Sequence, residues 1–185
     1  MKNQVEILLH DLTYNTKYEF LDYGKHKDEL DDVAGRNNIK FPAHDLAIFK
    51  GTYGFVDRQN KNGCTLPKEE VEKALGTLRA KAVDFDHLRQ RVVGHWLEAK
   101  LEGDTIIAYG VFHKGNFSED YELVKKLMDG NNLGISFEAW GNTEITGNNS
   151  YNLNDIEFAG GALLIKTQPA FDGAGVLELS NKKIL

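Results

Sequence analysis

The stretch LGISFEAW at residues 133–140 has the alternation that is typical of a β-strand whose two faces differ in chemistry. Successive side chains of a strand point to opposite faces, so Ile135, Phe137 and Ala139 share one face. Ser136 and Glu138 share the other face. The pattern predicts a strand that packs an apolar side against a core. It leaves two interpretations of the Ser136 hydroxyl, which either faces water or belongs to a site.

Outward from this stretch, the chain predicts a single α+β domain over residues 1–185. Glycine-rich turns separate about eight or nine short strands. Two helices are expected, one begun at Pro67 and one capped by Ser118. Residues 25–38 are polar and charged, and they are expected to form a surface loop. The fold class that follows is a mostly antiparallel, barrel-like sheet flanked by helices, with residues 1–45 poorly patterned. The expected strands are residues 5–9, 18–23, 46–49, 53–56, 91–101, 105–112, 133–145, 151–158 and 162–167.

Composition excludes several classes of function. The 185 residues include 22 basic and 28 acidic side chains, for a net charge of −6. An acidic chain argues against a protein that binds nucleic acid by neutralising phosphates, and against a polybasic membrane anchor. One cysteine cannot form an internal disulfide, which favours a reducing, intracellular compartment. No apolar run approaches the length of a membrane span, and the first residues lack the apolar core of a signal peptide.

The segment VDFDH at residues 83–87 predicts a short strand that delivers His87 at its end. A histidine in this place can act as a general base near neutral pH. Two other interpretations are a surface histidine beside two acids and a metal site made by Asp84, Asp86 and His87. The spacing of these three matches no common zinc pattern. Cys64 is a further candidate nucleophile, although a small residue at a turn is the more common role.

The segment NDIEFAGGALLIKTQPA at residues 154–170 contains a carboxylate and a glycine pair. Glu157 projects from the strand face opposite Ile156 and Phe158. Gly160 and Gly161 could direct backbone N–H groups into a site without side-chain obstruction, as an oxyanion hole requires. The alternative for the pair is a β-bulge.

Taken in order, four features over residues 46–178 resemble the prohead (procapsid maturation) proteases of tailed bacteriophages, which are distantly related to the herpesvirus assemblin proteases. A glycine-punctuated strand is followed by DRQNKNG at 57–63 and the helix begun at Pro67. A short strand ends in Asp86-His87 and is followed by the strand at 96–100. A helix then leads into LGIS at 133–136, which is similar to the nucleophile strand of the family. Glu157 precedes an apolar strand and Pro169-Ala170.

The resemblance implies a catalytic set for this chain. Ser136 would be the nucleophile and His87 the general base. No histidine follows Ser136, so an acid must orient the imidazole; Glu157 is the first choice and Asp155 the second. Gly160 and Gly161 would supply oxyanion donors. One departure from the family pattern is Glu138, which stands two residues after the serine where a small or polar residue is expected.

The resemblance also implies a serine endopeptidase that needs no cofactor and no metal. It would cleave the scaffolding protein, the major capsid protein and itself inside the assembling prohead, in the host cytoplasm. Self-association as a dimer is possible by analogy with the herpesvirus enzymes, and neither nucleic acid nor a membrane is an expected partner. The alternatives are a non-catalytic structural or assembly protein of the virion on the same fold, and a metal hydrolase using Asp84, Asp86 and His87.

Overall fold

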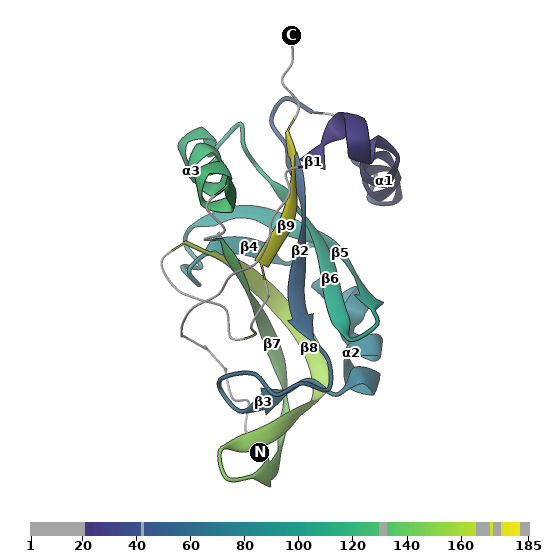
Figure 1. The fold of residues 1–185 in the computed structure, drawn as a ribbon, viewed down its shortest axis with the longest axis vertical. Coiled ribbons are helices and arrows are strands. Elements are labelled where there is room, and N and C mark those ends of the chain that lie inside the picture. The colour runs from purple at the N-terminus through teal and green to yellow at the C-terminus, as the bar shows by residue number, and fades with distance from the viewer. Residues whose placement is uncertain (1–20, 42, 130–132, 166–170, 172–174, 182–185) are drawn as a thin grey trace.

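The computed structural model of the chain describes residues 21–41, 43–129, 133–165, 171 and 175–181 (Figure 1). The described residues form three α-helices, one 3₁₀ helix and nine strands, which confirms the α+β class. The expected strand at residues 5–9 and the Pro169-Ala170 ending lie outside the described residues. The strands are β1 (Leu21–Asp22), β2 (Ala47–Phe55), β3 (Cys64–Thr65), β4 (Ala82–Phe85), β5 (Val92–Glu102), β6 (Thr105–Phe112), β7 (Gly134–Gly147), β8 (Ser150–Leu164) and β9 (Gly175–Asn181). The helices are α1 (Tyr23–Arg36), α2 (Lys68–Ala74), η1 (Leu75–Leu78) and α3 (Ser118–Asp129).

The strands join in the order β1-β9-β2-β6-β5-β4-β8-β3, and β7 pairs with β8. Most neighbours are antiparallel, but β4 runs parallel to β8. Strand β9 pairs with β2 and also meets β7 at the single pair Gly134–Gly175. Strand β4 therefore lies between β5 and β8, and β8 lies between β4 and β7.

One large apolar core fills the space between the inner faces of these strands. The alternating residues of β7 contribute Ile135 and Phe137, as their spacing predicts. Tyr53 lies at the centre of the core, and its ring contacts those of Trp96 and Phe158 at edge-to-face angles. Because the apolar residues of β4, β7 and β8 point into this core, the polar residues between them face the opposite side of the sheet.

Residues 25–38 were expected to form a surface loop, and this expectation is wrong for residues 25–36, which belong to helix α1. Leu30, Val33 and Ala34 lie three and four residues apart, so they form one buried stripe. This stripe packs on a second apolar cluster that includes Ile48 of β2 and Tyr109 of β6. The stripe is narrow, and acidic residues surround it, which conceals the helix in the sequence.

The two segments expected as separate strands at 151–158 and 162–167 form one long strand, β8. Its ladder with β7 shifts register at Ala159, because Glu138 pairs with Gly160 while the next residue, Ala139, pairs with Phe158. The extra residue is a β-bulge, which is the alternative interpretation of the glycine pair. The helices at Pro67 and Ser118 occur where the sequence predicts them.

Candidate active site

Strand β7 carries Ser136 and Glu138 on the face that points away from the main core. Two residues of extended chain separate their Cα atoms by about 6.7 Å, on the same side of the strand. Ser136 pairs with Ala162 of β8, and Glu138 pairs with Gly160. Both partners have small or absent side chains, which leaves room above β8 for groups from its other neighbour, β4.

The turn after β4 presents His87. Asp86 and His87 have positive φ angles of 50° and 61°, a conformation that side chains other than glycine adopt rarely. Hydrogen bonds hold this turn to β8: the Asp86 N–H donates to the Leu163 carbonyl at 3.1 Å, and Asp86 Oδ1 accepts from the Ile165 N–H at 2.9 Å. The strained turn is therefore held in place by two groups of Asp86, its backbone N–H and its side-chain carboxylate.

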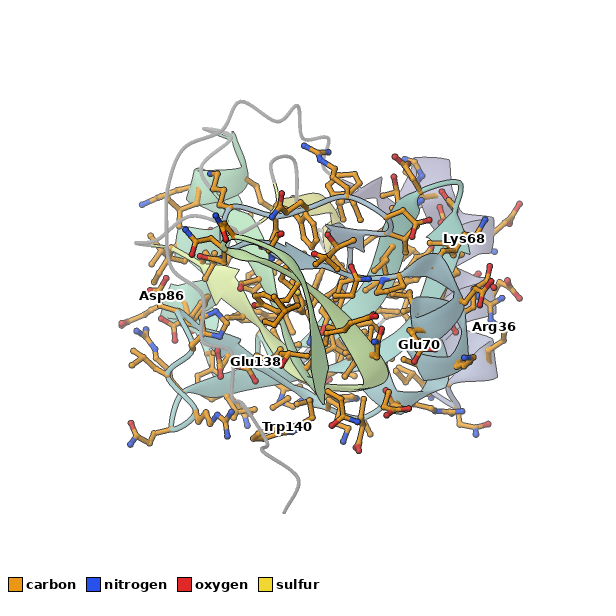
Figure 2. All side chains as sticks on the ribbon, turned by 90° about the horizontal axis from the view of Figure 1, so that it is seen from below. Arg36, Lys68, Glu70, Asp86, Glu138 and Trp140 are labelled. Atoms are coloured by element: carbon orange, nitrogen blue, oxygen red, sulfur yellow. The ribbon has the colours of Figure 1, made fainter. Side chains whose placement is uncertain are left out.

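The imidazole of His87 meets the carboxylate of Glu138. His87 Nδ1 lies 2.8 Å from Glu138 Oε1, and the two side chains are only 4% and 13% exposed. The hydrogen bond with His87 holds the pKa of Glu138 below its usual range, although burial opposes this. An ionised carboxylate on Nδ1 is the arrangement that orients a histidine base and stabilises its charged form. Figure 2 shows Glu138 and Asp86 on the side of the molecule away from Arg36 of α1.

Ser136 shares this face with Asp84 as well. Asp84 and Ser136 both pair with Ala162, one from each side, so two strand spacings, about 9.5 Å, separate their Cα atoms. Ser136 is 3% exposed and Asp84 is 4% exposed, so both polar side chains are buried. The structure thus brings the two principal sequence candidates, Ser136 and His87, to one face, with Glu138 on the same strand as the serine.

Glu157 and Asp155, the acids expected to orient His87, have other partners. Glu157 is 57% exposed, and its Oε1 accepts a hydrogen bond from Lys81 Nζ at 3.0 Å. Asp155 Oδ2 accepts from the side-chain amide of Asn142 at 2.6 Å. The acid against His87 is Glu138, the residue that departs from the family pattern.

The sequence analysis did not predict the contact of Glu138 with His87, although the strand pattern contains an indication of it. Glu138 lies two residues after Ser136 on the same strand face, which the alternation of residues 133–140 shows. The histidine approaches that face from β4, and only the pairing of β4 with β8 decides which acid it meets.

The glycine pair lies inside β8, between two neighbouring strands. Gly161 pairs with Val83 on one side and with Phe137 on the other. A Cβ atom at position 161 would lie 2.9 Å from the Ser136 carbonyl oxygen and 2.9 Å from the Tyr53 ring. At position 160 it would lie 3.1 Å from Glu138 Oε2. Both glycines therefore allow a close approach of β8 to the residues of the site, and their role as oxyanion donors stays a prediction.

Cys64 does not have the surroundings of a nucleophile. Its side chain is fully buried, and burial raises the pKa of the thiol to about 11. The thiolate form, which is the reactive one, is therefore disfavoured at neutral pH.

The residues that could hold a cation in the structure differ from the set expected from the sequence, which was Asp84, Asp86 and His87. Asp84, His87 and Glu138 each offer a ligand atom, and these atoms lie within 4.8 Å of one another. Asp86, which the sequence grouped with Asp84 and His87, uses its carboxylate for the backbone of Ile165 instead. Carboxylate and imidazole ligands suit several divalent metals, so the donor set fits a cation without selecting one.

A pocket of about 210 Å³ adjoins the acids of the site. Glu138 and Asp84 form part of its wall, and Trp140 of β7 and Val92 of β5 add apolar surface. Lys81 and Arg89 contribute positive charge. This pocket therefore adjoins Glu138, the acid that contacts His87.

The chain matches no protein-family model and no curated protein. Among solved structures, it is similar to the capsid assembly protease gp21 of bacteriophage T4, with a TM-score of 0.50. The two sequences are 12% identical, and the likeness covers 73% of this chain and 81% of that chain. At this identity, the similarity concerns the fold. Within the described residues, no helix has the length and apolar character needed to cross a membrane.

Proposed function

We propose that this chain is a serine endopeptidase of phage capsid maturation, with Ser136 as nucleophile, His87 as general base and Glu138 as the orienting acid. The observation that carries the proposal is the 2.8 Å contact between His87 Nδ1 and Glu138 Oε1, on the strand face that Ser136 shares. The fold similarity to a capsid assembly protease supports the same class of activity.

The chemistry follows from the residue types. His87 Nε2, the ring nitrogen that does not face Glu138, takes the hydroxyl proton as Ser136 Oγ attacks a peptide carbonyl. The same proton is then given to the leaving amine, and water later hydrolyses the acyl-enzyme. Glu138 fixes the tautomer with the proton on Nδ1 and stabilises the imidazolium that forms. Gly160 and Gly161 remain candidates for the oxyanion donors.

The substrates and the setting extend the same proposal. A capsid assembly protease acts on capsid-related proteins, so the scaffolding protein, the major capsid protein and the chain itself are the proposed substrates. The proposed setting is the interior of the prohead in the host cell. The finer fold assignment, a barrel-like sheet of the herpesvirus type, is part of the proposal, and the single pair between β7 and β9 supports only its barrel-like character. A dimer of the herpesvirus kind belongs to the same proposal.

Co-expression with the scaffolding protein tests the nucleophile. We expect the wild-type chain to cleave the scaffold, as seen on a gel, and Ser136→Ala and His87→Ala to leave it intact. Circular dichroism spectra that match wild type would show that the variants fold. Cleavage that persists in Ser136→Ala would remove the serine assignment. An intact scaffold with the wild-type chain would instead favour the non-catalytic virion protein.

A metal hydrolase is the second candidate, because Asp84, His87 and Glu138 form a donor set. The two mechanisms respond differently to a chelator. A serine protease keeps its activity in EDTA and loses it in Ser136→Ala, whereas a metal hydrolase loses its activity in EDTA and keeps part of it in that variant.

A further inference from the structure

Asp84 is a buried acid that the proposed mechanism does not use. It lies in β4 between two core residues, so its side chain lies on the opposite face of the sheet, which Glu138 shares. Only 4% of the residue is exposed. The carboxyl group accepts a hydrogen bond from the backbone N–H of His87, but its Oδ1 atom has no hydrogen-bond partner among the described residues. Burial of an unpaired carboxyl oxygen costs free energy, and a bound cation would remove this cost.

Asp84 belongs to a cluster of three possible metal ligands. Asp84, His87 and Glu138 each offer one ligand atom, from β4, from the turn after β4 and from β7, and these atoms lie within 4.8 Å of one another. The ligand atoms of a tetrahedral zinc site lie about 3.4 Å apart, since each is about 2.1 Å from the ion. His87 Nδ1 and Glu138 Oε1, at 2.8 Å, are already near this spacing. The widest separation therefore has to shorten by no more than about 1.4 Å to enclose an ion.

The charges around this cluster and its access to solvent suit a divalent cation. Asp84 and Glu138 bring two carboxyl groups, whose ionised forms together balance the charge of such an ion. Arg89 faces both acids, but it is exposed, so water and salt screen its charge. Lys81, which lines the same pocket, is paired with Glu157. The pocket of about 210 Å³ has Asp84 and Glu138 in its wall, which provides a path from solvent to the ligands.

We propose that Asp84, His87 and Glu138 bind one divalent metal ion, and that this ion inhibits the protease. Zn²⁺ accepts both imidazole and carboxylate ligands, so it serves as the probe. The inhibition rests on the proposed function, in which His87 is the base, whereas the binding rests on the three ligands alone. The sign of the effect separates this role from that of a metal hydrolase, which would need the ion for activity.

The inhibition follows from the chemistry of the imidazole. A neutral imidazole has one N–H and one nitrogen with a free lone pair. If the ion takes His87 Nδ1, the ring proton is on Nε2, which then cannot accept the hydroxyl proton of Ser136. If the ion takes Nε2, the lone pair that would accept this proton is bound to the metal. The base is therefore lost whichever nitrogen binds the ion.

Calorimetric titration with Zn²⁺ alone tests the binding in the Ser136→Ala variant, without any need for proteolysis. We expect the tightest site to take one ion per chain. Adding Asp84→Asn, which keeps the shape of the side chain and removes a charged ligand, should weaken this binding by at least about tenfold. The matched control Glu122→Gln removes an exposed acid on α3 and should leave the affinity unchanged. The His95–His113 pair offers zinc a different place, so His113→Gln should also leave the affinity unchanged.

Urea denaturation with and without Zn²⁺ shows whether these variants fold. An ion that binds the folded chain raises the free energy of unfolding, so zinc should stabilise Ser136→Ala and have little effect on the double variant with Asp84→Asn. Equal affinity and equal stabilisation in these two proteins would overturn the site. Loss of the tightest binding in His113→Gln would overturn it as well.

The scaffold-cleavage assay tests the sign of the effect. We expect saturating Zn²⁺ to stop cleavage by the wild type nearly completely, and EDTA to restore it. In Asp84→Asn, the same zinc concentration should change the rate much less, relative to the rate of that variant without zinc. Cleavage that requires zinc, or that zinc leaves unchanged when it is bound, would overturn the inhibitory role. A wild type that cleaves nothing, while Ser136→Ala binds zinc through the expected ligands, would keep the metal site and overturn the proposed function, and the inhibition with it.

Discussion

Ser136 and Glu138 lie two positions apart in β7, and this spacing puts a hydroxyl and a carboxylate on one face of the strand. The alternation of residues 133–140 predicts this shared face from the sequence. It does not predict that the face is buried, or that His87 arrives there from β4. The strand pairing places Glu138 against His87, whereas Glu157, the first choice from the sequence, is exposed and paired with Lys81.

Glutamine in place of each acid tests this assignment. Glu138→Gln cannot hold the His87 tautomer with an ionised partner, so we expect kcat on a scaffold peptide to fall by roughly 10²–10⁴-fold. Glu157→Gln, the matched control, removes one partner of an exposed ion pair, which contributes little. It should keep nearly full activity. If Glu157→Gln lost activity and Glu138→Gln kept it, the role of the orienting acid would return to Glu157.

At the scale of elements, the sequence predicted most strands and two of the three α-helices, α2 and α3. Helix α1 was missed because its stripe of Leu30, Val33 and Ala34 is narrow and acidic residues surround it. Strand β8 was divided in two because Gly160 and Gly161 look like a break in a sequence, whereas in the structure they continue the strand past a bulge. In a sequence, a glycine that lets two strands approach closely looks the same as a glycine in a turn. Only the neighbouring strands in the structure distinguish the two.

The close approach at Gly161 leads to a prediction about β8. In Gly161→Ala, the new methyl group would press on the Ser136 carbonyl and the Tyr53 ring, both 2.9 Å away, and on Trp96. We expect the free energy of unfolding to fall by roughly 1–3 kcal/mol, with a loss of cleavage because β7 moves. Urea denaturation and a scaffold-cleavage assay measure the two effects.

Gly76→Ala is the matched control, because nothing lies within 4 Å of its new methyl group. It should leave stability nearly unchanged. Equal effects of the two substitutions would show that the contacts of Gly161 do not restrict β8.

For the whole molecule, the order of strands could not be read from the sequence. Local patterns indicate which segments are strands, but the parallel pairing of β4 with β8 joins residues nearly eighty positions apart. The α+β class followed from the count and spacing of elements. The arrangement of the candidate site did not follow from the sequence, because it depends on the long-range pairing of β4 with β8.

A histidine pair predicts how the stability of the whole molecule depends on pH. His95 Nδ1 lies 3.2 Å from His113 Nε2, and burial, with His113 second, lowers the pKa of His95 from 6.5. Below pH 6.5 the unfolded chain takes up a proton that the folded chain resists. The free energy of unfolding should therefore decrease as the pH falls from 6.5 to the lowered pKa of His95.

Denaturation series between pH 5 and 8, for the wild type and His95→Gln, measure this contribution. Asp84 acts in the opposite sense, since its raised pKa means that the folded chain holds a proton there that the unfolded chain releases. Both proteins contain Asp84, so its contribution cancels when the free energies of unfolding of the wild type and of His95→Gln are subtracted. We expect wild type to lose more stability on acidification than His95→Gln; parallel curves would contradict the role of the histidine pair.

The pairing of β4 with β8 also has a consequence for the time at which activity can arise. The three proposed catalytic residues have all been synthesised once the chain reaches Glu138, but β4 has no partner on that side until residues 161–163 follow. A nascent chain that ends between these points contains the whole catalytic set and lacks the strand that holds its two parts together. With the proposed function, we therefore expect the chain to stay inactive through most of its own translation, until β8 has been made and can join the two parts of the site.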